Sequence, residues 1–271
     1  MVFEYLAILI FILLALEVLL FFLVKIVRKN LTLSFPKKSF GEIKELERKF
    51  YIHFSDLMVE MIKNFSISKN EMLKRYTFKN IELINKEEKK GKSTILILGH
   101  FSNWEGMLTI GSHLIGNAYG IYTPLTNKYF EKKMTKSREK YGSFLLSRYT
   151  TFDFIESMKN SKDYGLFGFI GDQSPKKESN SYMRTFMGVK VPVFTGAERI
   201  AKKYNFPVFY CQINRVKRGF YNAEIFALAK KPLEFKDNEI TNLFFDRLEK
   251  QIKQNPSEYL WSHNRFKYMV K

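Results

Sequence analysis

Short apolar segments alternate with amphipathic ones through most of the chain, and this alternation constrains the fold more than any other feature. We predict strands over five segments: Thr94–Leu98, Ala118–Tyr122, Gly165–Ile170, Pro207–Ile213 and Tyr221–Leu228. We predict helices over three others: Asn127–Tyr141, Thr195–Tyr204 and Asn238–Gln254. Strands that alternate with helices of roughly 10 to 15 residues are typical of parallel sheets. The predicted fold class is therefore α/β, with a helix-covered, largely parallel sheet.

The chain begins with an apolar segment long enough to cross a membrane. From Tyr5 to Val24, sixteen of twenty residues are Leu, Ile, Phe or Val, and twenty helical residues span about 30 Å, the thickness of the hydrocarbon core. A secretory signal would carry its positive charges before the apolar run. Here Glu4 precedes the run, and the basic residues follow it at Lys25, Arg28 and Lys29.

We interpret residues 1–30 as an uncleaved transmembrane anchor and residues 31–271 as one domain. Because the basic residues follow the apolar run, the positive-inside rule places this domain in the cytoplasm. A helix that lies in the membrane interface is the alternative, although the segment has no polar stripe.

Composition limits the partners and the chemistry. The net charge of +18 calls for an anionic partner, such as nucleic acid, a membrane surface, or an acidic protein or substrate. We find no element that reads nucleic acid, and we therefore expect no nucleic-acid partner. The single cysteine, Cys211, excludes an intrachain disulfide. Its apolar neighbours predict an inert core thiol.

Two capping boxes precede the predicted sheet. Ser39 and Glu42 have the required spacing, and apolar residues then recur at helical intervals as far as Ile62. Ser68 and Glu71 repeat the pattern before a short helix. We interpret His53, within the first of these helices, as a boundary or surface residue.

The strand Thr94–Leu98 leads directly into polar residues that suit catalysis. Gly99 and His100 follow the strand, and Ser102 or Asn103 can cap a helix that has Glu105 in its first turn. On one continuous helix, His100 and Glu105 would lie about 140° apart, whereas a turn before the helix lets them meet. A carboxylate that accepts the imidazole N–H selects the tautomer and stabilises the imidazolium. The alternative is a histidine at a strand end and a glutamate that caps the helix.

Further polar residues follow the strand Gly165–Ile170. Asp172 and Gln173 come at its carboxyl end, the side on which open α/β sheets bind ligands. They could contact substrate or simply form turn hydrogen bonds. Arg138, on a lysine-rich helix, suits either phosphate recognition or a solvated helix face. His263, in an aromatic and basic C-terminal segment, is weak evidence for catalysis by itself.

Taken in order, these segments resemble the late acyltransferases of lipid A biosynthesis. The matching segments are Arg28–Leu31, Phe35–Pro36, Leu98–Glu105, Tyr122–Asn127, Arg138 with Gly142, Asp172–Pro175, Pro192–Gly196 and Leu260–Lys267. A histidine followed after four residues by an acid is shared with glycerol-phosphate acyltransferases, and the ordered set is more specific. The sequence departs from the pattern at Thr123, where relatives commonly have a basic residue.

The resemblance implies a fold of the glycerol-phosphate acyltransferase-like type and an enzyme of the bacterial inner membrane, on its cytoplasmic face. In that family a fatty acyl group passes from an acyl-carrier-protein thioester to a hydroxyl of a lipid A precursor, an anionic glycolipid. Carried to this chain, His100 would be the general base and Glu105 its orienting partner. The expected substrate-binding residues are Asn103, Arg138, Asp172 and Gln173. No metal or other cofactor is required.

Three alternatives stay open at this point. The donor could be a coenzyme A thioester. The acceptor could be a lysophospholipid, an aminolipid, a phosphatidylinositol mannoside or a pigment-linked lipid, and Thr123 makes this question relevant because it removes a cation beside the expected site. From another class, the chain could be a non-catalytic membrane scaffold.

Overall fold

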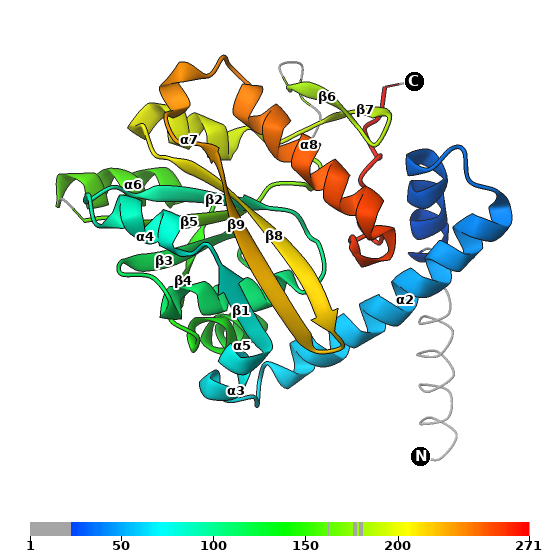
Figure 1. The fold of residues 1–271 in the computed structure, drawn as a ribbon, viewed down its shortest axis with the longest axis horizontal. Coiled ribbons are helices and arrows are strands. Elements are labelled where there is room, and N and C mark those ends of the chain that lie inside the picture. The colour runs from blue at the N-terminus through cyan, green and yellow to red at the C-terminus, as the bar shows by residue number, and fades with distance from the viewer. Residues whose placement is uncertain (1–22, 162, 176–177, 179–180, 271) are drawn as a thin grey trace.

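A computed structural model describes residues 23–161, 163–175, 178 and 181–270 of the chain. Its centre is a seven-stranded sheet in the order β1-β9-β8-β2-β5-β3-β4 (Figure 1). The strands are β1 (Tyr76–Lys79), β2 (Thr94–Leu98), β3 (Asn117–Tyr122), β4 (Ser143–Ser147), β5 (Gly165–Ile170), β8 (Val208–Lys217) and β9 (Phe220–Ala229). Neighbouring strands are parallel except for the antiparallel pair β8 and β9. The predicted α/β class with a largely parallel sheet is confirmed.

Helices cover both faces of this sheet. The α-helices that follow residue 39 are α2 (Phe40–Lys63), α3 (Lys69–Arg75), α4 (Glu82–Glu88), α5 (Lys128–Glu139), α6 (Thr151–Asn160), α7 (Gly196–Tyr204) and α8 (Glu239–Gln254). Three 3₁₀ helices, η1 (Trp104–Ser112), η2 (Pro232–Glu234) and η3 (Pro256–Glu258), complete the list. The five predicted strands and three predicted helices are all present, with ends that differ by a few residues. Strands β1 and β4 and helix α6 were not predicted.

Alternate residues of β2 point into two separate cores. Leu96 and Leu98 belong to a core that includes residues of η1 and α4, and Cys211 lies in this core. Ile95 and Ile97 belong to the other core, which α6, α7 and α8 help to form. The Cys211 thiol is 1% exposed, and burial raises its pKa. The predicted inert core thiol agrees with this environment.

The N-terminal part of the described chain packs onto the domain. A helix over residues 23–34 buries Val27 and Leu31 in the second of these cores. The Asn30 side chain donates hydrogen bonds of 2.8 Å to the carbonyls of Trp261 and His263. The predicted boundary at residue 30 therefore lies inside a packed helix. The first 22 residues of the predicted anchor lie outside the described part of the chain, and no helix within the described part is long and apolar enough to cross a membrane.

The first predicted capping box is present in full and the second only in its serine half, but His53 differs from its prediction. Ser39 and Glu42 form the reciprocal capping box of α2, and Ser68 accepts a hydrogen bond from the Glu71 amide at the start of α3. His53 is only 4% exposed, so the prediction of a boundary or surface residue is wrong. Its Nδ1 atom accepts a 3.3 Å hydrogen bond from Arg215, which comes from the β8–β9 hairpin.

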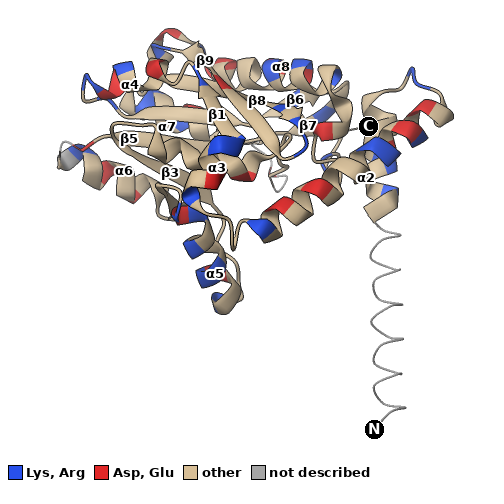
Figure 2. Ribbon diagram, turned by 60° about the horizontal axis from the view of Figure 1, so that its bottom comes forward, with Lys and Arg blue, Asp and Glu red and all other residues tan. Residues whose placement is uncertain are grey.

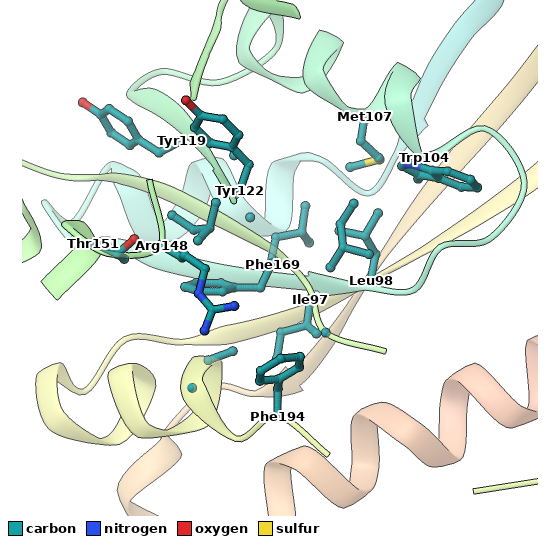
Figure 3. Close-up of a pocket in the computed structure, with 18 of the residues that line it drawn as sticks. Ile97, Leu98, Trp104, Met107, Tyr119, Tyr122, Arg148, Thr151, Phe169 and Phe194 are labelled. Atoms are coloured by element: carbon teal, nitrogen blue, oxygen red, sulfur yellow. The ribbon is translucent and has the colours of Figure 1, made fainter. Parts of the chain in front are cut away.

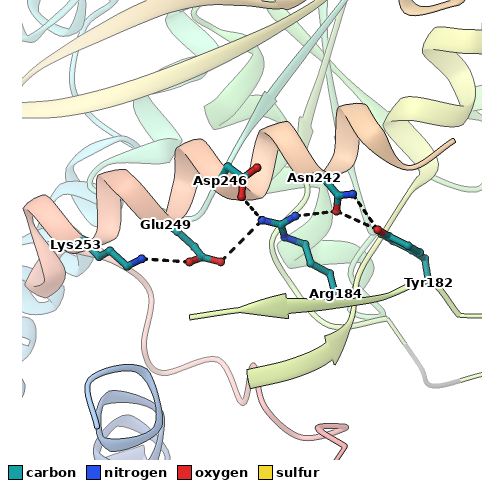
Figure 4. A network of polar contacts seen from close by, with 6 residues as sticks. All are labelled: Tyr182, Arg184, Asn242, Asp246, Glu249 and Lys253. Carbon is teal, nitrogen blue, oxygen red and sulfur yellow. Dashed lines mark hydrogen bonds and ion pairs between the residues drawn. The ribbon is translucent and has the colours of Figure 1, made fainter. Parts of the chain in front are cut away.

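A second, two-stranded sheet lies beside α8. It consists of β6 (Met183–Phe186) and β7 (Val189–Pro192), which pair antiparallel. Arg184 of β6 donates to Asn242 and Asp246 of α8, and the network continues through Glu249 to Lys253 (Figure 4). These contacts hold the hairpin against α8. The hairpin follows the loop that leaves β5, so it also limits where that loop ends.

Candidate active site

The sheet register brings His100 and Asp172 together. Leu98 at the end of β2 pairs with Ile170 at the end of β5, and each polar residue lies two positions beyond this pair. His100 Nδ1 lies 2.7 Å from Asp172 Oδ1. Because an ionised carboxylate can only accept, Nδ1 carries the proton and donates a hydrogen bond to Asp172. The Nε2 atom then carries a lone pair that can accept a hydrogen bond or a proton.

Burial and charge determine how Asp172 interacts with the imidazole. The Asp172 side chain is 2% exposed and that of His100 is 15% exposed. Burial alone would raise the pKa of Asp172, but attraction to His100 and hydrogen bonds from it hold this pKa below its ordinary value. Asp172 is therefore ionised and suited to stabilise a protonated imidazole. The Gln173 side-chain amide lies 3.2 Å from His100 Nε2 and can donate to it.

Glu105 does not pair with His100, which corrects the predicted role of this residue. Both Glu105 oxygens accept hydrogen bonds from Arg138, at 2.9 and 2.6 Å. The Glu105 side chain is 10% exposed and that of Arg138 is 25% exposed. The orienting carboxylate is Asp172, and Glu105 instead forms a two-point ion pair with Arg138 beside His100. Arg138 is thus not on a solvated helix face.

The backbone between His100 and Glu105 explains this change of partner. Ser102 has φ of +52°, and its amide donates to the Glu258 carbonyl at 2.8 Å. Phe101 forms an isolated β-bridge with Tyr259, and the Leu260 amide donates to the His100 carbonyl at 3.0 Å. The C-terminal segment therefore holds this turn in a left-handed conformation. The predicted helix after it is the 3₁₀ helix η1.

Asn103 serves as the N-cap of η1. Its Oδ1 atom accepts from the Gly106 amide at 3.0 Å, and its Nδ2 atom donates to Glu60 of α2 at 2.7 Å. Asn103 is 3% exposed. Its side-chain amide is engaged at both ends, so the contacts describe a structural cap rather than a group that faces substrate.

The loop that carries Asp172 and Gln173 is clamped by residues whose role the sequence did not indicate. The Ser174 hydroxyl donates to the Arg265 carbonyl at 2.7 Å and accepts from the Arg265 guanidinium at 2.9 Å. The Ser174 amide donates to His263 Nε2 at 3.3 Å. Arg265 is 1% exposed. In the sequence, only the family resemblance pointed to this part of the chain, because it includes the segment Leu260–Lys267, and it gave these residues no role.

His100 lines a cavity of about 660 Å³, and Figure 3 shows other residues that line it. Four of the six predicted site residues line it: His100, Glu105, Arg138 and Gln173. Asp172 and Asn103 do not line it. Most other lining residues are apolar and include Leu98, Trp104, Met107, Ile110, Leu145, Phe169 and Phe194. The Trp104 ring lies edge-to-face with the imidazole, with ring centroids 5.2 Å apart. The site can therefore receive an apolar chain next to a histidine.

Fold and site together define a class of protein, namely an α/β protein with an imidazole–carboxylate pair at an apolar cavity, which suits acyl transfer of a lipid chain. The sequence matches the model of the bacterial lipid A biosynthesis acyltransferase family over residues 11–268, and the chain belongs to this family. The chain is therefore an acyltransferase, and the family supports acyl transfer to a lipid A precursor.

Two relatives illustrate how distant the individual similarities are. The chain is 19% identical over 247 residues to the lipid A biosynthesis palmitoleoyltransferase of Escherichia coli strain K12. This alignment covers 89% of the chain and 78% of the relative. The same values hold for the lipid A biosynthesis acyltransferase of Shigella flexneri.

Proposed function

We propose that the protein transfers a fatty acyl group from an acyl-carrier-protein thioester to a hydroxyl of a lipid A precursor at the inner membrane, with His100 as the general base. The observation that carries the proposal is the His100–Asp172 pair at the mouth of an apolar cavity. A coenzyme A thioester is the alternative donor. The names of the relatives favour a lipid A precursor over the other acceptors considered above.

The reaction needs one proton to move and no covalent enzyme intermediate. His100 Nε2 takes the proton of the acceptor hydroxyl while the hydroxyl oxygen attacks the thioester carbonyl carbon, which forms the C–O bond. The tetrahedral intermediate then collapses, the C–S bond breaks, and the imidazolium returns the proton to the sulfur, which leaves as a thiol. Proton transfer of this kind contributes about 100- to 10,000-fold to the rate. Asp172 stabilises the imidazolium between the two steps.

The surroundings of His100 suit the other demands of this reaction. Gln173 occupies the Nε2 lone pair, so the acceptor hydroxyl replaces its amide on binding. The amides of Trp104 and Glu105, at the start of η1, are the candidates for stabilising the oxyanion, because the amide of Gly106 is already bonded to Asn103. Arg138 adds positive charge nearby, although Glu105 neutralises part of it.

Substitution of His100 tests the assignment of the base. We expect His100→Ala to abolish acyl transfer from acyl-carrier protein to a phosphorylated lipid A precursor, because no other group lies at the position of Nε2. The matched control is His113→Ala, which changes a histidine outside the cavity lining and should leave turnover unchanged. Near wild-type turnover by folded His100→Ala would remove His100 as the base.

Membrane association is supported by the surface of α5. This helix projects from the body and is rich in basic residues (Figure 2). Leu125, Tyr129 and Phe130 are exposed at its N-terminal end, and the neighbouring lysines are Lys128, Lys132, Lys133 and Lys136. Exposed aromatic and aliphatic side chains among lysines suit the interface of an anionic leaflet. Arg138, at the other end of α5, lines the cavity, so docking here would bring the leaflet close to the site.

Vesicle binding tests this contact. Tyr129→Ser combined with Phe130→Ser should weaken co-sedimentation with phosphatidylglycerol-containing vesicles, because two interfacial rings are lost. Leu233→Ser is the control, since this exposed residue lies in η2 beside α7, away from α5 (Figure 1). Equal vesicle binding by the double variant and the control would argue against docking through α5.

A further inference from the structure

The cavity extends along both faces of the sheet. Leu96, Gly120 and Gly168 are register partners in neighbouring strands, and Leu96 faces the core that contains η1 residues. Ile97 and Phe169 point to the opposite face, towards α7 and α8. All five residues line the one cavity. Figure 3 shows the same division, with Met107 on one side of the strands and Phe194 on the other.

We name the two parts by the helices that cover them. The η1 lobe is lined by Leu96, Leu98, Met107, Leu108, Ile110, Ala118, Leu145, Leu166 and Ile170. The α7 lobe is lined by Tyr119, Ile121, Arg148, Thr151, Phe169, Phe194, Glu198 and Thr241. His100 and Gln173 also line this cavity, just beyond the carboxyl ends of β2 and β5, and a single cavity can reach both faces of the sheet around this edge. A group bound in either lobe can therefore reach the same imidazole.

The η1 lobe has the chemistry of a binding site for a hydrocarbon chain. Its walls are aliphatic, and the hydroxyl of Ser143 at the lining is already engaged. That hydroxyl donates to the Leu108 carbonyl at 2.6 Å and accepts from the Gly111 amide at 3.3 Å. Gly168 leaves open space on this face of β5, since a Cβ there would meet only the Tyr119 carbonyl oxygen, at 3.7 Å. We therefore expect the acyl chain to bind in this lobe.

The α7 lobe contains a cation without a carboxylate partner. Arg148 follows β4, and its amide donates to the Tyr122 carbonyl at 2.9 Å. Its guanidinium lies over the rings of Tyr149 and Phe194, at 5.4 and 5.8 Å from their centroids. Within the described part of the chain, no carboxylate forms an ion pair with Arg148. Arg138, by contrast, is paired with Glu105. Arg148 is thus the guanidinium at this cavity that is available to an anion.

The same lobe contains a buried acceptor that lacks one hydrogen bond. Glu198, in the first turn of α7, is 3% exposed. Its Oε2 atom accepts from the amide and the hydroxyl of Thr241, at 2.9 and 2.5 Å. Its Oε1 atom has no hydrogen-bond partner. A buried acceptor that is left unpaired is unfavourable, and a donor on a substrate would satisfy it.

We propose that the α7 lobe binds a phosphate-bearing headgroup of a substrate, with Arg148 on the phosphate and Glu198 Oε1 on a hydroxyl or amide donor. This rests on the proposed function. A planar guanidinium held by aromatic rings matches a phosphate in geometry and charge. Two substrates of the proposed reaction carry a phosphate together with such donors: the lipid A precursor and the phosphopantetheine arm of the carrier protein. The acyl chain in the η1 lobe and the headgroup in the α7 lobe then meet at His100.

Binding measurements test the site without turnover. The probes are the deacylated, phosphorylated headgroup of the lipid A precursor and 4′-phosphopantetheine, each titrated into the purified full-length protein. We expect Arg148→Gln to raise the dissociation constant of one probe about tenfold or more, since a hydrogen-bonded charge pair is lost. The probe that responds identifies the source of the phosphate. Arg199→Gln is the matched control, an exposed arginine of α7 that does not line the cavity, and should change neither constant.

Kinetics give a second readout and separate the two proposals. Arg148→Gln should raise the KM of the same substrate with kcat within about threefold, and removal of the phosphate from that substrate should abolish the difference from wild type. Glu198→Gln, which keeps an acceptor for Thr241, should weaken binding of the same probe. Equal dissociation constants for Arg148→Gln and wild type with both probes would overturn the site. Failure of the wild type to transfer acyl groups would instead refute the proposed function and leave the binding result intact.

Discussion

Asp172→Asn is the substitution that best separates the observed arrangement from the one predicted by spacing. The asparagine has nearly the same size, and its Oδ1 atom can still accept the hydrogen bond from Nδ1–H, so the ring orientation is retained while the negative charge is lost. Two unit charges about 4 Å apart attract by about 4 kcal/mol at an effective dielectric constant of about 20. Since 1.36 kcal/mol corresponds to tenfold in rate, we expect kcat to fall on the order of a thousandfold. Asp172 does not line the cavity, so KM should change little.

The assay is steady-state transfer of a labelled acyl group from carrier protein to a phosphorylated lipid A precursor, with the thermal midpoint of unfolding measured for each variant. Asp246→Asn is the control, because this carboxylate is 65% exposed and pairs with Arg184 rather than with His100 (Figure 4). A folded Asp172→Asn protein that keeps more than a tenth of the wild-type kcat would refute the view that this carboxylate stabilises the imidazolium.

Three further predictions follow from other contacts. Glu105→Gln and Arg138→Gln should each lower kcat/KM at least tenfold. Because the two residues act as a pair, kcat/KM of the double variant should be no lower than that of the less active single variant. Additive losses would show that the two residues act independently. Gly168→Leu should shift the preference of the enzyme towards shorter acyl thioesters, by roughly fourfold per displaced methylene. The reason is that a Cβ there approaches only a carbonyl oxygen, at 3.7 Å, and the side chain extends into the η1 lobe. Competition between thioesters of different length measures this preference, and an unchanged preference would contradict the prediction. Burial and the charge of Arg215 lower the pKa of His53 to about 4, so the unfolded chain binds this proton before the folded chain as the pH falls. The free energy of unfolding should therefore drop by roughly 3 kcal/mol between pH 6.5 and 4. Urea titrations of His53→Gln should lack this part of the pH dependence.

The elements that depend on local pattern could be predicted from the sequence. The strands β2 and β5 are apolar runs of five and six residues, and the caps of α2 and α3 rest on a serine and a glutamate three positions apart. Strands β1 and β4 escaped prediction because each is short and has only one buried residue. Pairing with β9 and β3 stabilises them, and this pairing does not require an alternation of apolar and polar residues in the strand itself. The buried environment of His53 likewise depends on a hairpin 162 residues away.

The same distinction between local sequence pattern and contacts of distant segments applies to the candidate site. The position of His100 beyond a strand end follows from local sequence, whereas its partner depends on which strands are neighbours. His100 and Asp172 are 72 residues apart and meet because β2 and β5 are adjacent and in register. Sequence spacing offers Glu105 as the nearer carboxylate, and only the left-handed turn at Ser102, held by the Glu258 carbonyl, directs it to Arg138 instead. A histidine followed after four residues by an acid is therefore compatible with two arrangements of charge. In this chain the C-terminal segment that binds the turn decides between them, so substitutions that loosen this segment should change the activity of His100 without touching it.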